Sequence, residues 1–151
     1  MEDIVIRNLC KSFAGKPVLR DFSAVLPVGQ VTGLMAPSGA GKTTLLRILM
    51  GLERPDGGTI DGLAGLRLSA GFQARELSGG MRRRVAILRA LLAEYDLLFL
   101  DEPFKGLDRE TKETVMADTR RRCAGRTVLL VTHDVAELDA MGAVVRLDLS
   151  T

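Results

Sequence analysis

The stretch VTGLMAPSGAGKTTLLRIL, residues 31–49, decides how this chain folds. It begins with a short apolar run at 31–36, passes through a turn that contains Gly39 and Gly41, and continues into a helical pattern from about residue 42. A buried strand that leads through a glycine-rich turn into a helix is the arrangement of a phosphate-binding loop. We therefore expect an α/β domain built around this strand and this helix.

The rest of the chain continues the alternation of short apolar runs and longer helical patterns, which favours a mostly parallel sheet flanked by helices. The cluster ERPDGG at 53–58 is interpreted as a turn. No repeat or linker is visible, so residues 1–151 are expected to form one domain. Further strands are predicted over 66–72, 97–101, 127–132 and 143–147, helices over 78–93 and 108–122 with a short one before the last strand, and an N-terminal antiparallel β region over 4–9 and 18–26.

Three of these segments are predicted to be buried. The runs LLFLD at 97–101 and TVLLVT at 127–132 are continuously apolar or nearly so, which is typical of strands covered on both faces. The helix that begins near Ser78 is apolar nearly all round, so it is also expected to be buried. Its apolar residues are Val85, Ala86, Ile87, Leu88, Leu91 and Leu92.

The composition and charge of the chain argue against a nucleic-acid partner and against a membrane-spanning protein. The chain is 46% hydrophobic and 26% charged, as soluble globular proteins are, and its net charge of +2 is too small to indicate a nucleic-acid partner. Cys10 and Cys123 lack metal-ligand spacing and are read as free thiols in a reducing compartment. No apolar run approaches the roughly 18 residues of a membrane span, and no signal-peptide pattern opens the chain. We expect a cytoplasmic protein with no direct membrane insertion.

The loop APSGAGKTT at 36–44 has the chemistry of a phosphate site. Backbone N–H groups at a helix N-terminus bind anions, and glycines such as Gly39 and Gly41 let the backbone curl around phosphates. Lys42 would reach the β- and γ-phosphates, and the Thr43 hydroxyl would coordinate Mg²⁺. The other loop residues expected to contact the nucleotide phosphates are Ser38, Ala40 and Thr44.

One position departs from the strict phosphate-loop pattern. Ala36 stands where that pattern has its first glycine. Alanine is harmless there if the residue keeps a negative φ, and costly if it needs a positive one. The alternative interpretation of the loop is a glycine-containing turn before a helix that happens to carry a lysine.

Polar residues follow two of the buried strands. Asp101 and Glu102 end LLFLDE, and His133, the only histidine, comes directly after TVLLVT. Ligands bind at the carboxyl ends of strands in open α/β sheets. Asp101 is suited to holding Mg²⁺, and Glu102 to polarising an attacking water as general base. His133 would donate to the γ-phosphate or hold that water. The alternatives are solvated acids at a strand end and a structural histidine.

Taken together, these pieces resemble the nucleotide-binding domain of ATP-binding cassette (ABC) ATPases. LSGG at 77–80 matches the signature of the family, and DEPFKGLD at 101–108 contains its D-loop. Phe13, in KSFAGKPVL, matches the aromatic residue that stacks on adenine. The motifs LSGGM and DEPF are most similar to those in the ATPases of bacterial importers for nitrate, sulfonates and related small solutes.

The resemblance implies ATP and Mg²⁺ as cofactors and a head-to-tail homodimer that encloses ATP between the phosphate loop of one copy and the signature of the other. Gln73 would sense Mg²⁺ and the attacking water, and Asp108 would link the two sites. Transmembrane permease subunits are the implied partners, and they would place the protein peripherally on the inner face of the cell membrane. The signature residues that would contact the nucleotide are Ser78, Gly79 and Gly80.

One part of the family's pattern is missing. The family has a helical subdomain between the glutamine and the signature, whereas here only residues 74–77 separate Gln73 from Ser78. Five residue steps span at most about 17 Å, which is too short for a subdomain. We expect the ATP-binding core to fold without it. Coupling to a permease is in question, because the subdomain carries much of the groove that receives it.

Three functions remain open on the sequence alone. The first is an ATPase of an ABC importer that still hydrolyses ATP. The second is a regulatory or degenerate nucleotide-binding module with little turnover, which Ala36, Lys105 in the D-loop and the lost subdomain favour. The third is a fold kept for interaction alone. The combination of a phosphate-loop lysine, two strand-end acids and a histidine argues against the third.

Overall fold

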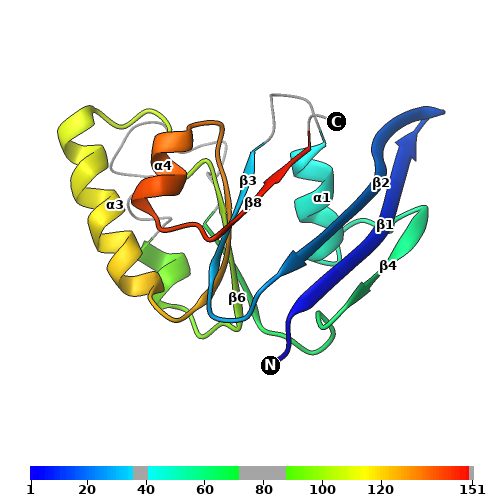
Figure 1. Cartoon of the computed structure of the whole chain (residues 1–151), viewed down its shortest axis with the longest axis horizontal. Helices are drawn as coiled ribbons and strands as arrows, with labels where there is room; N and C mark the ends of the chain where they lie inside the picture. The colour runs from blue at the N-terminus through cyan, green and yellow to red at the C-terminus, as the bar shows by residue number, and fades with distance from the viewer. Residues whose placement is uncertain (36–40, 72–87, 150–151) are drawn as a thin grey trace.

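The computed structural model describes residues 1–35, 41–71 and 88–149. An N-terminal antiparallel sheet has the strand order β2-β1-β4 (Figure 1). It confirms the predicted antiparallel β region and extends it, because the first two strands continue into a hairpin whose last pair is Phe13 with Lys16. The strands of this sheet are β1 (Ile4–Phe13), β2 (Lys16–Leu26) and β4 (Gly57–Asp61).

The prediction of a turn over 53–58 is wrong at its end, because Gly57 and Gly58 belong to β4. Gly57 pairs with Cys10 of β1. Gly58 has φ 92°, and a Cβ on it would lie 2.4 Å from the carbonyl oxygen of Asn8. The glycines that suggested a turn instead allow a close approach to β1, so strand pairing overrides their local preference.

The second sheet has five parallel strands in the order β5-β6-β7-β3-β8. It confirms the predicted α/β class with a mostly parallel sheet. Two boundaries differ from the prediction, since β5 begins at Leu68 and not at residue 66, and β8 begins at Val145 and not at residue 143. The five strands are β3 (Val31–Met35), β5 (Leu68–Gly71), β6 (Leu97–Asp101), β7 (Thr127–Val131) and β8 (Val145–Asp148).

Helices cover both faces of the parallel sheet. In Figure 1, α3 and α4 lie on one side of it, while α1 and the antiparallel sheet lie on the other. Asp108 and Asp134 cap α3 and α4 by accepting hydrogen bonds from backbone N–H groups of the first turn. Among the described residues, no helix is both long and apolar enough to cross a bilayer. The helices are α1 (Lys42–Leu49), α3 (Arg109–Cys123) and α4 (Val135–Ala140).

The hydrophobic core has two parts, one on each face of the parallel sheet. Leu97 and Phe99 of β6 pack into the part that includes α1 and the antiparallel sheet. Leu98 and Leu100 pack into the part that includes Phe104 and residues of α3 and α4. Both predictions of strands buried on two faces are therefore confirmed, because alternate side chains of one strand enter different clusters.

The predicted helix over 78–93 is described only from residue 88, and residues 88–92 are helical. The prediction that this helix is buried is wrong for most of the described part. Ala90 is buried, but Leu88 is 41% exposed and Leu92 is 66% exposed. Ala90 and Leu91 belong to the core cluster that contains the α3 side chains, so this turn packs through one side. Exposed leucines are ordinary on protein surfaces, which is why apolar content alone misled the prediction.

Candidate functional site

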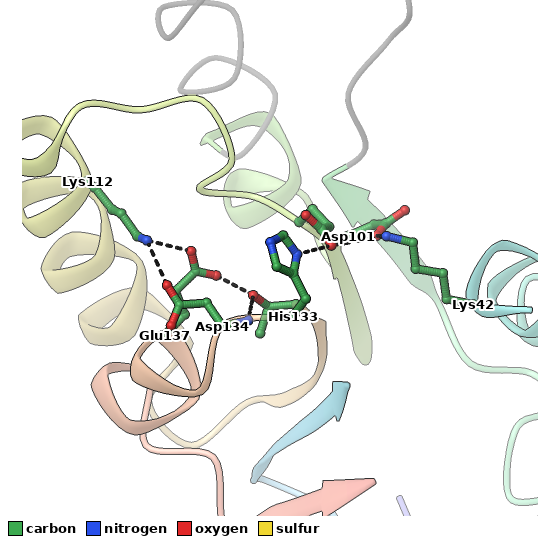
Figure 2. A network of polar contacts seen from close by, with 8 residues as sticks. Lys42, Asp101, Lys112, His133, Asp134 and Glu137 are labelled. Carbon is green, nitrogen blue, oxygen red and sulfur yellow. Dashed lines mark hydrogen bonds and ion pairs between the residues drawn. The ribbon is translucent and has the colours of Figure 1, made fainter. Parts of the chain in front are cut away.

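The carboxyl ends of β3, β6 and β7 lie at one edge of the parallel sheet, because these strands run parallel and in register. Asp101 is the last residue of β6 and pairs with Val131, the last residue of β7. Glu102 and His133 follow these two strands directly or after one residue. Lys42 begins α1, and Figure 2 shows its side chain reaching toward Asp101, with His133 on the other side.

The N-terminus of α1 has a local geometry that suits an anion. Its N-cap, Gly41, has φ 87°, and a Cβ there would lie 2.9 Å from both Cγ1 and the carbonyl oxygen of Val18. Glycine is therefore required for its conformation and for its contact with β2. Within the part of the chain that the structure describes, no side chain caps α1 and no acid lies in its first turn. The backbone N–H groups in the first turn of α1, with the Thr43 side chain exposed beside them, suit phosphate oxygens.

Lys42 and His133 bind the same atom of Glu102. The Nζ atom of Lys42 lies 3.1 Å from Oε1 of Glu102, and the Nδ1 atom of His133 lies 2.8 Å from it. The same Nζ lies 4.0 Å from Oδ1 of Asp101. The structure thus brings together four of the predicted site residues, one from α1, two at the end of β6 and one after β7.

Glu102 has an uncommon backbone conformation. Its φ is 49°, in the left-handed region that non-glycine residues rarely adopt. Its N–H donates to the carbonyl oxygen of Val131 at 2.7 Å, so one further hydrogen bond joins the ends of β6 and β7. Such strain persists where surrounding structure fixes it, and it concentrates at functional sites. It turns Glu102 away from the direction of the strand and toward Lys42 and His133.

The carboxyl group of Glu102 is ionised at neutral pH. Burial of the side chain, which is 11% exposed, raises its pKa. The hydrogen bonds from His133 and Lys42, together with their charges, act in the opposite direction and leave the pKa below its ordinary value. The His133 ring is 64% exposed and can reach groups outside the protein.

Phe13, the predicted adenine-stacking residue, lies on the other sheet at the β1–β2 hairpin and is 45% exposed. The ammonium group of Lys11 lies 5.1 Å from the centre of its ring, at a cation–π distance. Lys11 is itself held by Glu53 and Asp56, each at 3.3 Å. Because β2 also contacts Gly41, the sheet that carries Phe13 borders the start of α1.

Of the remaining predicted site residues, the structure describes some, and others lie outside the described residues. Thr44 is half-buried in the first turn of α1. Asp108 caps α3, accepting from the N–H and the hydroxyl group of Thr111 at 2.8 and 3.0 Å. Lys105 is exposed in the turn before it. The predictions for Ala36, Ser38, Gly39, Ala40, Gln73, residues 74–77, Ser78, Gly79 and Gly80 lie outside the described residues.

Sequence reasoning missed a second charged cluster beside His133. The Nζ atom of Lys112 on α3 lies 2.8 Å from Oε1 of Glu137 and 3.2 Å from Oδ2 of Asp134. The hydrogen bond to Glu137 is the main cause that raises the pKa of Lys112. The N–H of Ala136, and then Lys112, lower the pKa of Asp134. The only sequence signals of this cluster were Lys112, one helical turn after the cap Asp108, and Glu137, four residues after His133.

Two hollows lined by described residues lie away from this edge. One of about 690 Å³ lies between Leu88 and Leu91 on one side and α3 on the other. Another of about 690 Å³ lies among β3, the last turns of α3 and the end of α4. We place the site at the strand ends because the lysine, the two acids and the histidine converge there, and because loop residues 36–40 border it in sequence.

Comparison with known proteins identifies the family of the chain. The family model described as ABC transporter matches residues 19–70 and 62–105. The aliphatic sulfonates import ATP-binding protein of Pseudomonas fluorescens is 33% identical over 91% of this chain and 70% of its own length. The taurine import ATP-binding protein of Yersinia pestis is 33% identical over 87% of this chain and 74% of its own length.

Two further features of these matches are informative. The alignment with the sulfonate protein runs over 189 positions, which is more than the 151 residues of this chain, so the relative carries residues without a counterpart here. Among solved structures, a bacterial Atm1-family ABC exporter with ATP bound matches with a TM-score of 0.80 at 20% identity. This match covers 91% of the chain and about a third, 35%, of the exporter chain, and it supports the fold.

Proposed function

Because the chain belongs to the ABC transporter family, we propose that it binds and hydrolyses ATP as the nucleotide-binding subunit of an importer of a small solute. One observation carries the proposal. Lys42, at the start of α1, and His133, after β7, both reach one oxygen of Glu102 at the carboxyl edge of the parallel sheet. A cation, a hydrogen-bond donor and a carboxylate around a helix N-terminus are the groups that phosphoryl transfer requires.

Binding of ATP would redistribute the contacts of Glu102. The triphosphate competes for Lys42 and for the exposed His133, because both can donate to phosphate oxygens. Glu102 would then lose the two hydrogen bonds that lower its pKa and become a stronger base beside the γ-phosphate. The phosphate-loop contacts proposed with Lys42 come from Ser38, Gly39, Ala40, Gly41 and Thr44, and Phe13 is proposed to stack on adenine.

The described residues fit a magnesium ion as well as a phosphate. Thr43 offers a hydroxyl group at the start of α1, and Asp101 offers a carboxylate whose Oδ1 lies 4.0 Å from the ammonium group of Lys42. Hard oxygen ligands of this kind are those Mg²⁺ prefers. With Gln73, these residues would hold the ion, which supplies charge neutralisation at the phosphates when it is bound.

The proposed assembly is a head-to-tail homodimer in which Ser78, Gly79 and Gly80 of one copy contact the ATP held by the other. Asp108, at the start of α3, would link the two sites. The partners proposed outside the dimer are permease subunits, which would hold a cytoplasmic protein at the inner face of the membrane. The importer names of the relatives support this partner class.

We further propose that residues 74–77 replace the helical subdomain. The excess length of the sulfonate relative supports this proposal. The two buried clusters and both sheets lie in the residues that remain, which supports a core that folds without the subdomain. Cooperative thermal unfolding that shifts upward with Mg-ATP would support a core that folds and binds alone. A ligand at 100 times its Kd stabilises by about 2.7 kcal/mol.

The function is tested by phosphate release from Mg-ATP. Wild type, Lys42→Met and Arg47→Met are compared, because Arg47 is an exposed cation on the same helix. We expect turnover in wild type and Arg47→Met, and loss of both binding and turnover in Lys42→Met. Binding without turnover in the wild type would favour the regulatory module. Equal activity in all three proteins would remove Lys42 from the mechanism.

A further inference from the structure

A charged cluster joins α3 to the segment that carries His133. We define the Lys112 cluster as Lys112, Thr132, Asp134 and Glu137. Figure 2 shows Lys112 extending from α3 toward Asp134 and Glu137, next to His133. Its ammonium group binds both acids, at 3.2 and 2.8 Å. The proposed ATPase mechanism leaves all four residues without a role.

The two residues that flank His133 are both fixed by this cluster. The hydroxyl group of Thr132, which is 1% exposed, donates to Oε2 of Glu137, and its backbone N–H donates to the carbonyl oxygen of Leu34 at 3.1 Å. The N–H of Asp134 donates to the Thr132 hydroxyl at 3.1 Å. Asp134 then caps α4 through Ala136 and accepts from Lys112. The backbone on each side of His133 is thereby tied to α3.

The His133 ring itself has little packing to hold it. It is 64% exposed, and the hydrogen bond described for it is the one to Glu102. Within the described residues, its position therefore depends on this hydrogen bond and on the backbone on either side. We propose that Lys112 is a positioning residue that holds His133 in reach of Glu102 and of the γ-phosphate. The part of this inference that concerns ATP rests on the proposed function.

Electrostatics explain why a cation is needed at this point. Glu137 is 6% exposed, and a buried carboxylate requires a partner of opposite charge. Without the ammonium group, Glu137 and Asp134 would face each other with no cation between them, and like charges repel. Separation of the two acids would pull on Thr132 and on the first turn of α4. His133 lies between these points, so its ring would move relative to Glu102.

The first test observes His133 directly, because it is the only histidine in the chain. NMR of the protein labelled with ¹³C-histidine gives ring signals from this residue alone. We expect Lys112→Met to shift or broaden them and Lys112→Arg to restore them. Arg121→Met is the control, since Arg121 lies on the same helix and pairs with Asp118 on the surface. Signals that stay unchanged in Lys112→Met would overturn the inference.

The second test measures ATP turnover with Glu102→Gln run in parallel. If Glu102→Gln abolishes the wild-type activity, the proposed function holds. Lys112→Met should then lower kcat roughly 10- to 100-fold with little change in KM, as a displaced catalytic group does. An unchanged kcat would overturn the positioning role alone. If the wild type has no turnover, the proposed function fails, and the NMR result still decides whether Lys112 positions His133.

A double variant separates positioning from stability. Lys112→Met with Glu137→Met replaces an ion pair whose acid is buried by apolar groups, and such a replacement is often neutral or stabilising. It removes the acceptor of the Thr132 hydroxyl as well, so we expect a folded protein with displaced His133 signals and low kcat. Recovery of wild-type signals and kcat in this variant would show that the cluster does not position His133.

Discussion

The Nδ1 atom of His133 lies 2.8 Å from Oε1 of Glu102, although the two residues are 31 positions apart. Parallel pairing of β6 with β7 produces this contact, because it sets Asp101 against Val131 and so places the residues that follow each strand next to each other. The left-handed conformation of Glu102 then directs its side chain to the histidine. The topology of the sheet thus supplies the geometry of the site.

The pKa of Glu102 should respond to its neighbours. Replacing Lys42 by methionine removes a hydrogen bond and a charge that lower it, so the pKa should rise. Titration of the carboxyl carbon by ¹³C NMR measures it, and Arg47→Met should leave it unchanged. A Glu102 pKa that does not rise in Lys42→Met would contradict the contact with Lys42.

The same lowered pKa predicts a pH dependence of stability. A carboxyl group whose folded-state pKa is depressed stabilises the protein above its unfolded-state pKa, here near the ordinary 4.5. This contribution is lost as the pH falls through the lower, folded-state value. The unfolding free energy of wild type should therefore fall relative to Glu102→Gln over that acidic range. Parallel urea unfolding of both proteins checks this, and a constant difference would contradict it.

Asp108 should stabilise α3 as its N-cap. Asp108→Ala removes the acceptors of the Thr111 N–H and hydroxyl groups and should cost about 1 kcal/mol. Asp108→Asn keeps an acceptor and should cost less. Urea unfolding measures both variants. Equal stability of Asp108→Ala and wild type would show that the cap contributes nothing.

Gly33 allows α4 to pack directly on β3. A Cβ at Gly33 would lie 2.5 Å from Cδ2 of Leu138, which is fully buried, so its displacement needs repacking. Gly33→Ala should destabilise the protein by about 1–3 kcal/mol. Adding Leu138→Ala should recover part of the overpacking cost, as a double-mutant cycle would reveal. Full additivity of the two substitutions would contradict the predicted clash.

Sequence pattern predicted most of the fold. The runs LLFLD and TVLLVT indicate burial on their own, since a strand covered on both faces is apolar at nearly every position. The strand β4 was missed because Gly57 and Gly58 carry a local turn preference that pairing with β1 overrides. The exposure of Leu88 and Leu92 was missed because apolar content does not tell which side of a helix finds a partner.

Part of the candidate site could be anticipated from the sequence. Lys42, Asp101, Glu102 and His133 could be expected to lie together because each lies at the end of a recognisable strand or the start of a helix. Lys112 could not be anticipated, because its partners Asp134 and Glu137 are more than twenty residues away and only the packing of α3 on α4 reveals them. The left-handed φ of Glu102 has no sequence signal at all, since glutamate rarely adopts it.

The central claim is that Glu102 acts as the base in ATP hydrolysis, and the rate of phosphate release by Glu102→Gln tests it most directly. Glu94→Gln makes the same chemical change at a side chain that is 90% exposed and serves as control. We predict that Glu102→Gln still binds Mg-ATP but turns over about 10²- to 10⁴-fold more slowly than wild type, while Glu94→Gln matches wild type. A Glu102→Gln protein that hydrolyses ATP at the wild-type rate would contradict the account.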